Sequence, residues 1–297
     1  MNKEIIEIIK KRNIHPIGYQ KMGKGFFIKD KNCDYFLKLN TCNYDIYKYL
    51  LSREFYNFPK NYNDIGDNYE LREFVPSIKV EKDQKVNDLL ETLALLHKKT
   101  IYKRVIDLDD IKKIYEELMG LINYKIDYFT KINDKCDNQE FLCPSNYLLI
   151  KNISLVYYLL DFSKNTLNLW YEKIKNNLNM RVCLLHNNVS LNHLVINQKK
   201  YLINWDKAMF DSPIKDIVSF YKLYYKDISL DNLFQIYEKI NPLEIIEKDL
   251  IMVYLIVGDN FNFSNNELLN TRIINDELIF LDSIYNYLKE KNKSEKR

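Results

Sequence analysis

The sequence has no uncharged apolar run that approaches the roughly 18 residues of a membrane-crossing helix. Its first segment, Met1–Arg12, interleaves charged residues with isoleucine and has no apolar core of signal-peptide length. The net charge is only +3 over 297 residues, which is too small to create a strong field for nucleic acid or for a membrane surface. We therefore expect a cytoplasmic protein without a nucleic-acid or membrane partner.

Cysteine and glycine are scarce. The five cysteines form an odd set without a Cys-x-x-Cys pair, which favours a reduced, intracellular protein; they are Cys33, Cys42, Cys136, Cys143 and Cys183. Glycine occurs six times, and no internal repeat or low-complexity linker is visible. The chain is long enough for two lobes or one large domain, and its 46% apolar and 29% charged residues are ordinary for a globular protein.

One stretch, Leu184–Asp206, organises the rest of the chain. An apolar run leads into a polar loop, which begins with His186-Asn187-Asn188 and continues to Asn192-His193. A strand, a turn and a second strand follow, and the second strand, Tyr201–Ile203, leads to Asn204-Trp205-Asp206.

This layout resembles the catalytic loop and metal-binding strand of the aminoglycoside phosphotransferase and choline kinase-like family, which shares the protein-kinase fold and includes spore-coat kinase-like proteins. In that family the loop reads roughly H-G-D-x-x-x-x-N and the later segment reads I-D-W-E. The resemblance places Asn188 at the catalytic Asp, His193 at the metal-binding Asn and Asn204 at the metal-binding Asp. His186 and Asn188 are therefore the candidate catalytic positions, and His193, Asn204 and Asp206 form the candidate metal site.

Two further segments resemble the same family in order and spacing. Leu93–His97 reads L-A-L-L-H, where we expect a packed or capping His97, and Asp211–Asp216 reads D-S-P-x-x-D, where the last Asp would brace the catalytic loop. This joint order argues against a chance His-Asn-Asn in an Asn-rich chain. The resemblance implies an α+β, bilobal fold, with a small lobe bearing an antiparallel sheet over residues 1–76 and a large helical lobe over residues 77–297.

The small lobe offers a candidate phosphate site. Strand-like runs cover Gly25–Lys29 and Asp34–Leu39, and glycines at Gly23 and Gly25 could let backbone amides approach a phosphate. An ordinary hairpin turn is the alternative. Strand alternation places Phe36 and Lys38 on one side and Leu37 and Leu39 on the other.

A lysine inside an apolar strand is expensive unless it meets an anion. The resemblance implies that Lys38 pairs with ATP phosphates and with a carboxylate of the following helix, Tyr44–Phe55, from either Asp45 or Glu54. An edge-strand lysine facing water is the alternative. A strand over Tyr69–Val75 follows a turn-rich connector, and the resemblance places adenine there; the candidate cofactor-binding residues are Lys38, Gly23, Gly25, Arg72, Glu73 and Phe74.

The remaining pattern is helical. Apolar spacing predicts helices over residues 2–12, Val86–Thr100, Asp109–Phe129, Tyr147–Asn176, Ile214–Tyr225 and much of Leu230–Lys291, with a polar loop over Lys131–Pro144. Trp170 and many tyrosines fall at core spacing in these helices.

The amides at the predicted site have chemical consequences. Asn204 offers one neutral oxygen to Mg²⁺, and His193 offers nitrogen, which suits zinc better, so Mg²⁺ binding is doubtful. Asn188 cannot accept a substrate proton as a carboxylate does, and loss of a positioned base lowers a rate by about 10²–10⁴. The His186 and His193 spacing is not a recognised zinc pattern.

Three functional hypotheses follow. The first is a pseudokinase that binds a nucleotide such as ATP or a small molecule, or that serves as a scaffold for a protein partner. The second is an active ATP-dependent small-molecule phosphotransferase with an altered metal site that uses Asp206, with Mn²⁺ as a candidate metal. The third is a structural protein that binds no nucleotide. The sequence identifies neither ligand nor partner.

Overall fold

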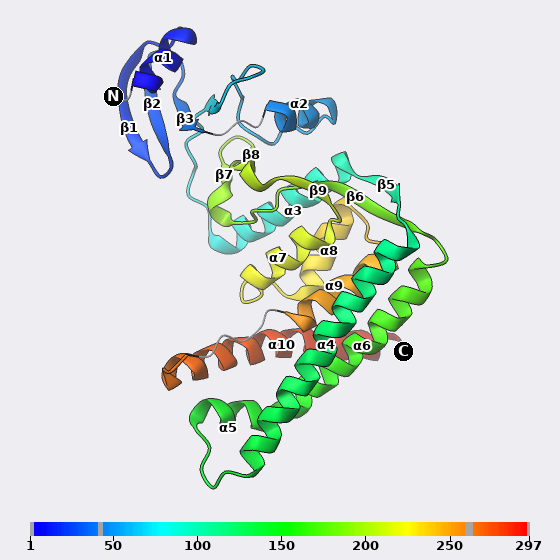
Figure 1. Cartoon of the computed structure of the whole chain (residues 1–297). Helices are drawn as coiled ribbons and strands as arrows, with labels where there is room; N and C mark the ends of the chain where they lie inside the picture. Colours follow the sequence, from blue (N-terminus) through cyan, green and yellow to red (C-terminus); the bar gives the residue numbers. More distant parts are fainter. Residues whose placement is uncertain (1–2, 41–43, 259–263, 296–297) are drawn as a thin grey trace. The chain divides into compact units, whose positions relative to one another are not determined.

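The chain begins with one short helix packed on an antiparallel sheet (Figure 1). The computed structural model describes residues 3–40, 44–258 and 264–295. The sheet has the strand order β1-β2-β3-β4. These elements are α1 (Lys3–Lys11), β1 (Pro16–Met22), β2 (Gly25–Asp30), β3 (Tyr35–Leu39) and β4 (Tyr69–Glu73).

The core of this sheet forms because apolar residues recur on one face of α1 and at alternate positions of the strands. The buried cluster consists of Ile5, Ile8, Ile9, Ile14, Ile28, Leu37, Tyr69 and Leu71. Leu37 is fully buried in this cluster and Leu39 packs against it, while Phe36 and Lys38 line a cavity instead. The predicted alternation of β3 is therefore confirmed.

The sheet belongs to the first of two compact units of the chain. The remaining elements of this first unit surround the predicted catalytic loop. These elements are α2 (Tyr44–Ser52), α3 (Lys82–Thr100), the short helices η1 (Leu191–His193) and η2 (Trp205–Lys207), the strands β7 (Leu194–Ile196) and β8 (Lys200–Leu202), and most of β9 (Met209–Asp211). Strands β7 and β8 form an antiparallel hairpin. The hairpin is tied to α3, because Lys200 Nζ lies 2.6 Å from carboxylate oxygens of both Asp88 and Glu91. His97 of α3 is fully buried, as expected.

A second unit is mostly helical. Its elements are β5 (Tyr102–Val105), α4 (Leu108–Asp137), α5 (Pro144–Lys151), α6 (Ile153–Ile174), most of β6 (Asn179–Leu185), α7 (Ile214–Tyr224), α8 (Leu230–Ile240), α9 (Ile245–Val257) and α10 (Glu267–Glu295). Helix α6 packs against α4 and α9, and Trp170 is buried as predicted. Within the described ranges, no helix has both the length and the apolar composition that a membrane crossing requires.

Contacts group the chain into two compact units, and the lobe boundary at residue 76 stays a prediction. The first unit comprises Met1–Thr100 with Leu184–Phe210, and the second comprises Ile101–Cys183 with Asp211–Arg297. Helix α3 belongs to the first unit because it contacts β8 and η1. The predicted site therefore lies within one unit.

Several predicted elements need correction. Lys131–Asp137 is the end of α4, not a loop, because Cys136 is buried there and Lys131 pairs with Asp127 one turn earlier at 2.6 Å. The helix predicted over Tyr147–Asn176 is split at Asn152, whose side chain donates to the Leu148 carbonyl at 2.9 Å. Strands β1 and β5 were not predicted, because most of their residues are exposed and show no apolar alternation. Cys42, residue 2 and residues 259–263 lie outside the described residues.

Candidate functional site

A cavity of about 440 Å³ lies in the first unit, between the sheet and the β7–β8 hairpin. This volume falls in the range of small-molecule sites. Apolar and polar side chains share its wall: Met22, Gly23, Lys24, Phe36, Lys38, Glu70, Arg72, Phe74, Val75, Ser77, Asn192, His193, Val195, Ile203 and Asn204. Four of the six predicted cofactor-binding residues and two of the three predicted metal-site residues are in this set.

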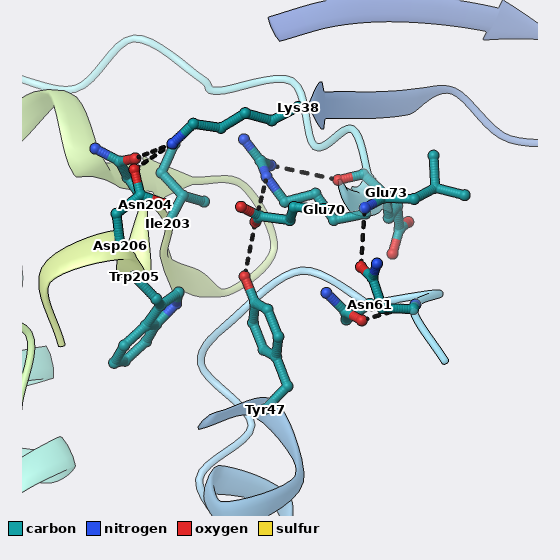
Figure 2. Close-up of polar contacts among 12 residues, drawn as sticks. Lys38, Tyr47, Asn61, Glu70, Glu73, Ile203, Asn204, Trp205 and Asp206 are labelled. Atoms are coloured by element: carbon teal, nitrogen blue, oxygen red, sulfur yellow. Dashed lines mark hydrogen bonds and ion pairs between the residues drawn. The ribbon is translucent and has the colours of Figure 1, made fainter. Parts of the chain in front are cut away.

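Lys38 lies in the cavity wall and its side chain is only 10% exposed. Its ammonium group forms an ion pair with Asp206 and donates to Asn204 Oδ1 at 3.3 Å (Figure 2). The anionic partner is thus Asp206, and the prediction that Asp45 or Glu54 pairs with Lys38 is wrong. Asp45 is exposed in the first turn of α2, and Glu54 pairs with Lys99 at 3.2 Å.

Helix α2 contributes a tyrosine to the site instead of a carboxylate. Tyr47 donates its hydroxyl to Glu70 Oε1 at 2.8 Å, and Glu70 lies directly opposite Lys38 in the β3–β4 register (Figure 2). Burial, together with the neighbouring Glu70 carboxylate, raises the pKa of Tyr47 well above its usual range. Tyr47 therefore remains a hydrogen-bond donor and holds Glu70 in place.

Arg72 is a second neighbour of the Glu70 carboxylate. Its Nε lies 3.6 Å from Glu70 Oε1, and its guanidinium stacks over the Phe36 ring at 4.5 Å from the ring centroid. Burial lowers the pKa of Arg72, and the Glu70 carboxylate opposes that shift. The charge of Arg72 is therefore compensated within the protein.

The side chains of Asn204 and His193 form one directed hydrogen-bond chain that ends at the backbone carbonyl of Asn188. Because the Lys38 ammonium can only donate, Asn204 Oδ1 must accept and Asn204 Nδ2 must face His193 Nε2, at 3.0 Å. His193 Nδ1 lies 2.7 Å from the Asn188 carbonyl oxygen, which can only accept. In this arrangement the His193 Nδ1 donates to that carbonyl and its Nε2 accepts from Asn204. The structure brings Asn188, His193 and Asn204 together beside Lys38.

The backbone at Asn204 is left-handed, with φ +70°. Asn and Asp are the residues besides glycine that adopt this conformation most readily. The local fold therefore accepts either residue, and it does not by itself explain why an amide stands here.

His186 does not line the cavity and is not part of the hydrogen-bond chain through Asn204 and His193. It is buried, its Nε2 lies 3.0 Å from the Ile203 carbonyl oxygen, and its ring packs edge-on against Trp205 at 4.9 Å. These contacts hold the loop against the second strand of the hairpin. Asp216 is buried in the first turn of α7, and its bracing role stays a prediction.

The two candidate glycines differ in position. Gly23 lies at the rim with φ +58°, as the first residue of the two-residue β1–β2 turn, where glycine is favoured. Gly25 is buried, and a Cβ there would lie 2.5 Å from the Phe36 ring, so its role is to admit that ring. The Glu73 amide donates to the Lys60 carbonyl at 2.8 Å, which engages it away from a ligand.

The residues present do not fit a Mg²⁺ ion. Over residues 3–40, 44–258 and 264–295, no three His, Cys, Asp or Glu side chains are grouped so that they could hold a metal. The oxygen of Asn204 faces an ammonium, the free nitrogen of His193 accepts from Asn204, and the Asp206 carboxylate pairs with Lys38. The three predicted positions therefore offer a metal one carboxylate, that of Asp206, and this carboxylate already pairs with an ammonium group.

Some cavity residues were missed by sequence reasoning. Glu70, Ser77, Asn192, Val195 and Ile203 line the cavity but were outside the predicted set. A signal existed for Glu70, because a carboxylate inside an apolar strand requires a partner. For Val195 and Ile203 the signal is weaker, since apolar residues in short strands usually indicate core.

No protein-family model and no curated protein matches this chain. The aminoglycoside phosphotransferase from Alicyclobacillus acidocaldarius aligns with 11% identity over 93% of each chain and a TM-score of 0.61. The AMP-bound spectinomycin phosphotransferase APH(9)-Ia aligns with 14% identity over 97% of this chain and 94% of that chain, with a TM-score of 0.50. The chain therefore has the α+β, bilobal, protein-kinase-like fold of the aminoglycoside phosphotransferases.

Proposed function

We propose that this protein is a ligand-binding member of the phosphotransferase fold that lacks efficient phosphoryl transfer. The observation that carries the proposal is the pairing of Lys38 with Asp206 and Asn204, continued through His193 to the Asn188 carbonyl. Groups that would hold phosphates or a metal are satisfied by one another. The proposal includes a cytoplasmic location, which rests on the composition of the sequence.

A nucleotide or a nucleotide-like small molecule is the expected ligand. The spectinomycin phosphotransferase of the same fold has been crystallised with AMP. In this chain the corresponding support is a cavity of suitable size with apolar walls and polar edges. ATP is therefore the first cofactor to test, with and without Mg²⁺.

The chemistry disfavours transfer. Phosphoryl transfer requires a held triphosphate, charge neutralisation and an oriented hydroxyl. Asn188 supplies no carboxylate base, and Asn204 and His193 supply no negative charge to a metal. A single missing base lowers the rate by about 10²–10⁴.

A panel of acceptor alcohols tests the proposal. The full-length protein is incubated with γ-labelled ATP, Mg²⁺ or Mn²⁺, and aminoglycosides, choline, homoserine or sugars, beside an active phosphotransferase as a positive control. We expect no labelled product above the protein-free blank. Turnover of any acceptor would refute the proposal.

One observation favours an active phosphotransferase as the second candidate. The Asp206 side chain is 33% exposed and lies beside Lys38, so a ligand could draw it out of the ion pair. If turnover is detected, Asp206→Ala should abolish it. Turnover that survives this substitution would reject this version of the site.

A further inference from the structure

The charges, walls and polar edge of the cavity indicate its ligand. We propose that the cavity binds an uncharged nucleoside by contacts to the planar base. Binding needs neither a metal ion nor a phosphate group on the ligand. This inference rests on the proposed function and names the ligand class of the same site.

The charges of the cavity leave little attraction for a polyphosphate. Lys38 is paired with Asp206, and Arg72 lies beside Glu70. Lys24, in the β1–β2 turn, is the third lining cation, so these five side chains carry a net charge of +1. A triphosphate carries several negative charges and would have to break the Lys38 pair. A neutral ligand leaves every pair intact.

The walls suit a flat ring. Phe36 and Phe74 come from the sheet side, and Val195 and Ile203 come from the hairpin. The Phe36 ring is held by the Arg72 guanidinium, and Phe74 packs edge-on against Phe27 at a centroid distance of 4.6 Å. Since both rings are already fixed, a stacked base loses little entropy to wall ordering on binding.

The Arg72 guanidinium in the cavity wall can donate hydrogen bonds to an acceptor atom of a nucleobase. The Arg72 side chain is only 8% exposed, yet its contacts to Glu70 Oε1 and to the Glu73 carbonyl are long, at 3.6 and 3.5 Å. A guanidinium has five N–H donors, and buried donors normally have partners at about 2.7–3.2 Å. A ring nitrogen or carbonyl of a base would give Arg72 a shorter acceptor. A purely apolar ring would not.

Calorimetric titration of the full-length protein tests this preference. Adenosine, guanosine and uridine are each compared with their own monophosphate and triphosphate, in MgCl₂ and in EDTA. We expect at least one nucleoside to bind within about threefold of the affinity of its own phosphates, with Mg²⁺ changing the affinity by less than about twofold. ATP with Mg²⁺ binding tenfold tighter than adenosine would overturn the inference, as would failure of all three nucleosides to bind.

A charge variant sharpens the test. Asp206→Asn should free the Lys38 ammonium and raise the ratio of ATP to adenosine affinity by about tenfold. Glu54→Gln, which removes the exposed partner of Lys99 in the same unit, is the matched control and should leave the ratio unchanged. An unchanged ratio in Asp206→Asn would contradict the inference.

A second variant tests whether the Arg72 guanidinium donates hydrogen bonds to the base. Arg72→Lys keeps a positive charge beside Glu70 but removes the planar donor fork, so nucleoside affinity should fall about tenfold. If this variant does not fold, the Asp206→Asn ratio still decides. Turnover in the acceptor panel refutes the proposed function, whereas a preference for Mg²⁺-ATP without turnover refutes only the ligand class.

Discussion

Two clusters in the first unit each contain a lysine–aspartate ion pair, but the two pairs lie in different surroundings. The amino-terminal cluster consists of Lys11, Arg12 and Asp67, and the cavity cluster consists of Lys38, Asn204 and Asp206. In the amino-terminal cluster, the Asp67 carboxylate is 2% exposed and accepts from Lys11 at 2.7 Å, from Arg12 and from the Asp64 amide at 2.8 Å. These bonds join the end of α1 to the loop before β4.

The two clusters differ in their surroundings. The Asp67 carboxylate is bound by Lys11, Arg12 and the Asp64 amide, none of which lines the cavity. Desolvation acts to raise its pKa, but the Asp64 amide, Lys11 and Arg12 together lower the pKa to about 2. In the cavity cluster, the lysine pairs with Asp206 at the wall of the cavity. The first cluster joins two segments of the fold, whereas under the proposed function the second removes a cation from use by a phosphate.

The largest predicted effect comes from changing three positions to the residues of the H-G-D-x-x-x-x-N and I-D-W-E patterns. Under the proposed function, the triple variant Asn188→Asp, His193→Asn, Asn204→Asp gains a base and a metal-binding carboxylate, and the left-handed backbone at 204 accepts Asp. We expect Mg²⁺-dependent ATP hydrolysis to rise by at least about 10²-fold over the unmodified protein. A coupled ADP-release assay measures it.

The matched control changes the net charge by the same amount elsewhere. Gln198→Glu with Lys199→Gln lies in the exposed β7–β8 turn and should leave hydrolysis at the background level. Equal hydrolysis in control and triple variant would show that bulk charge, and not the site, was responsible.

The next effect concerns the amino-terminal cluster. Asp67→Asn should lower the free energy of unfolding at pH 7 by about 2 kcal/mol, since the folded pKa lies near 2 and one pKa unit is worth about 1.4 kcal/mol. Urea denaturation measures this loss. Asp64→Asn removes a 65% exposed partner of Arg12 and should cost less than about 0.5 kcal/mol. Equal losses in the two variants would contradict the assigned role of Asp67.

The same cluster predicts a pH dependence. Because the folded pKa of Asp67 lies below its ordinary value of 3.8, its contribution is fully present above about pH 4 and is lost as the pH falls through 2. The stability difference between the unmodified protein and Asp67→Asn should therefore shrink between pH 5 and pH 3. Denaturation curves at both pH values check this. A difference that grows on acidification would be the wrong sign.

The smallest effect is on stability in the cavity cluster. Asp206→Asn should lower the free energy of unfolding by about 1 kcal/mol or less, because water screens its third-exposed carboxylate. The comparison with Asp67→Asn is made under the same denaturation conditions. If Asp206→Asn proved the more damaging of the two, Asp206 would be a structural residue first.

The successful predictions rest on short-range sequence patterns, namely strand alternation and the spacing of residues within one loop. The period of two in Tyr35–Leu39 separated Leu37 from Lys38 correctly, since alternation is a property of the strand itself. The spacing within Leu184–Asp206 likewise indicated which residues lie near one another. In the structure the His193 side chain contacts the Asn204 side chain and the backbone carbonyl of Asn188.

Long-range pairings explain what the sequence could not predict. Lys38 and Asp206 are 168 positions apart, and only packing of the hairpin against the sheet selects Asp206 over the nearer Asp45 and Glu54. The extension of α4 to Asp137 has a similar cause, because burial of Cys136 outweighs a locally polar composition. Tertiary contacts decided both outcomes.

A crystal structure with a non-hydrolysable ATP analogue and Mn²⁺ tests the central claim most directly, because anomalous scattering locates the metal. The account predicts that Lys38 stays paired with Asp206 and that no manganese peak lies within coordination distance of Asn204 or Asp206. A manganese ion bound by Asp206 and Asn204, with Lys38 turned to the phosphates, would contradict it.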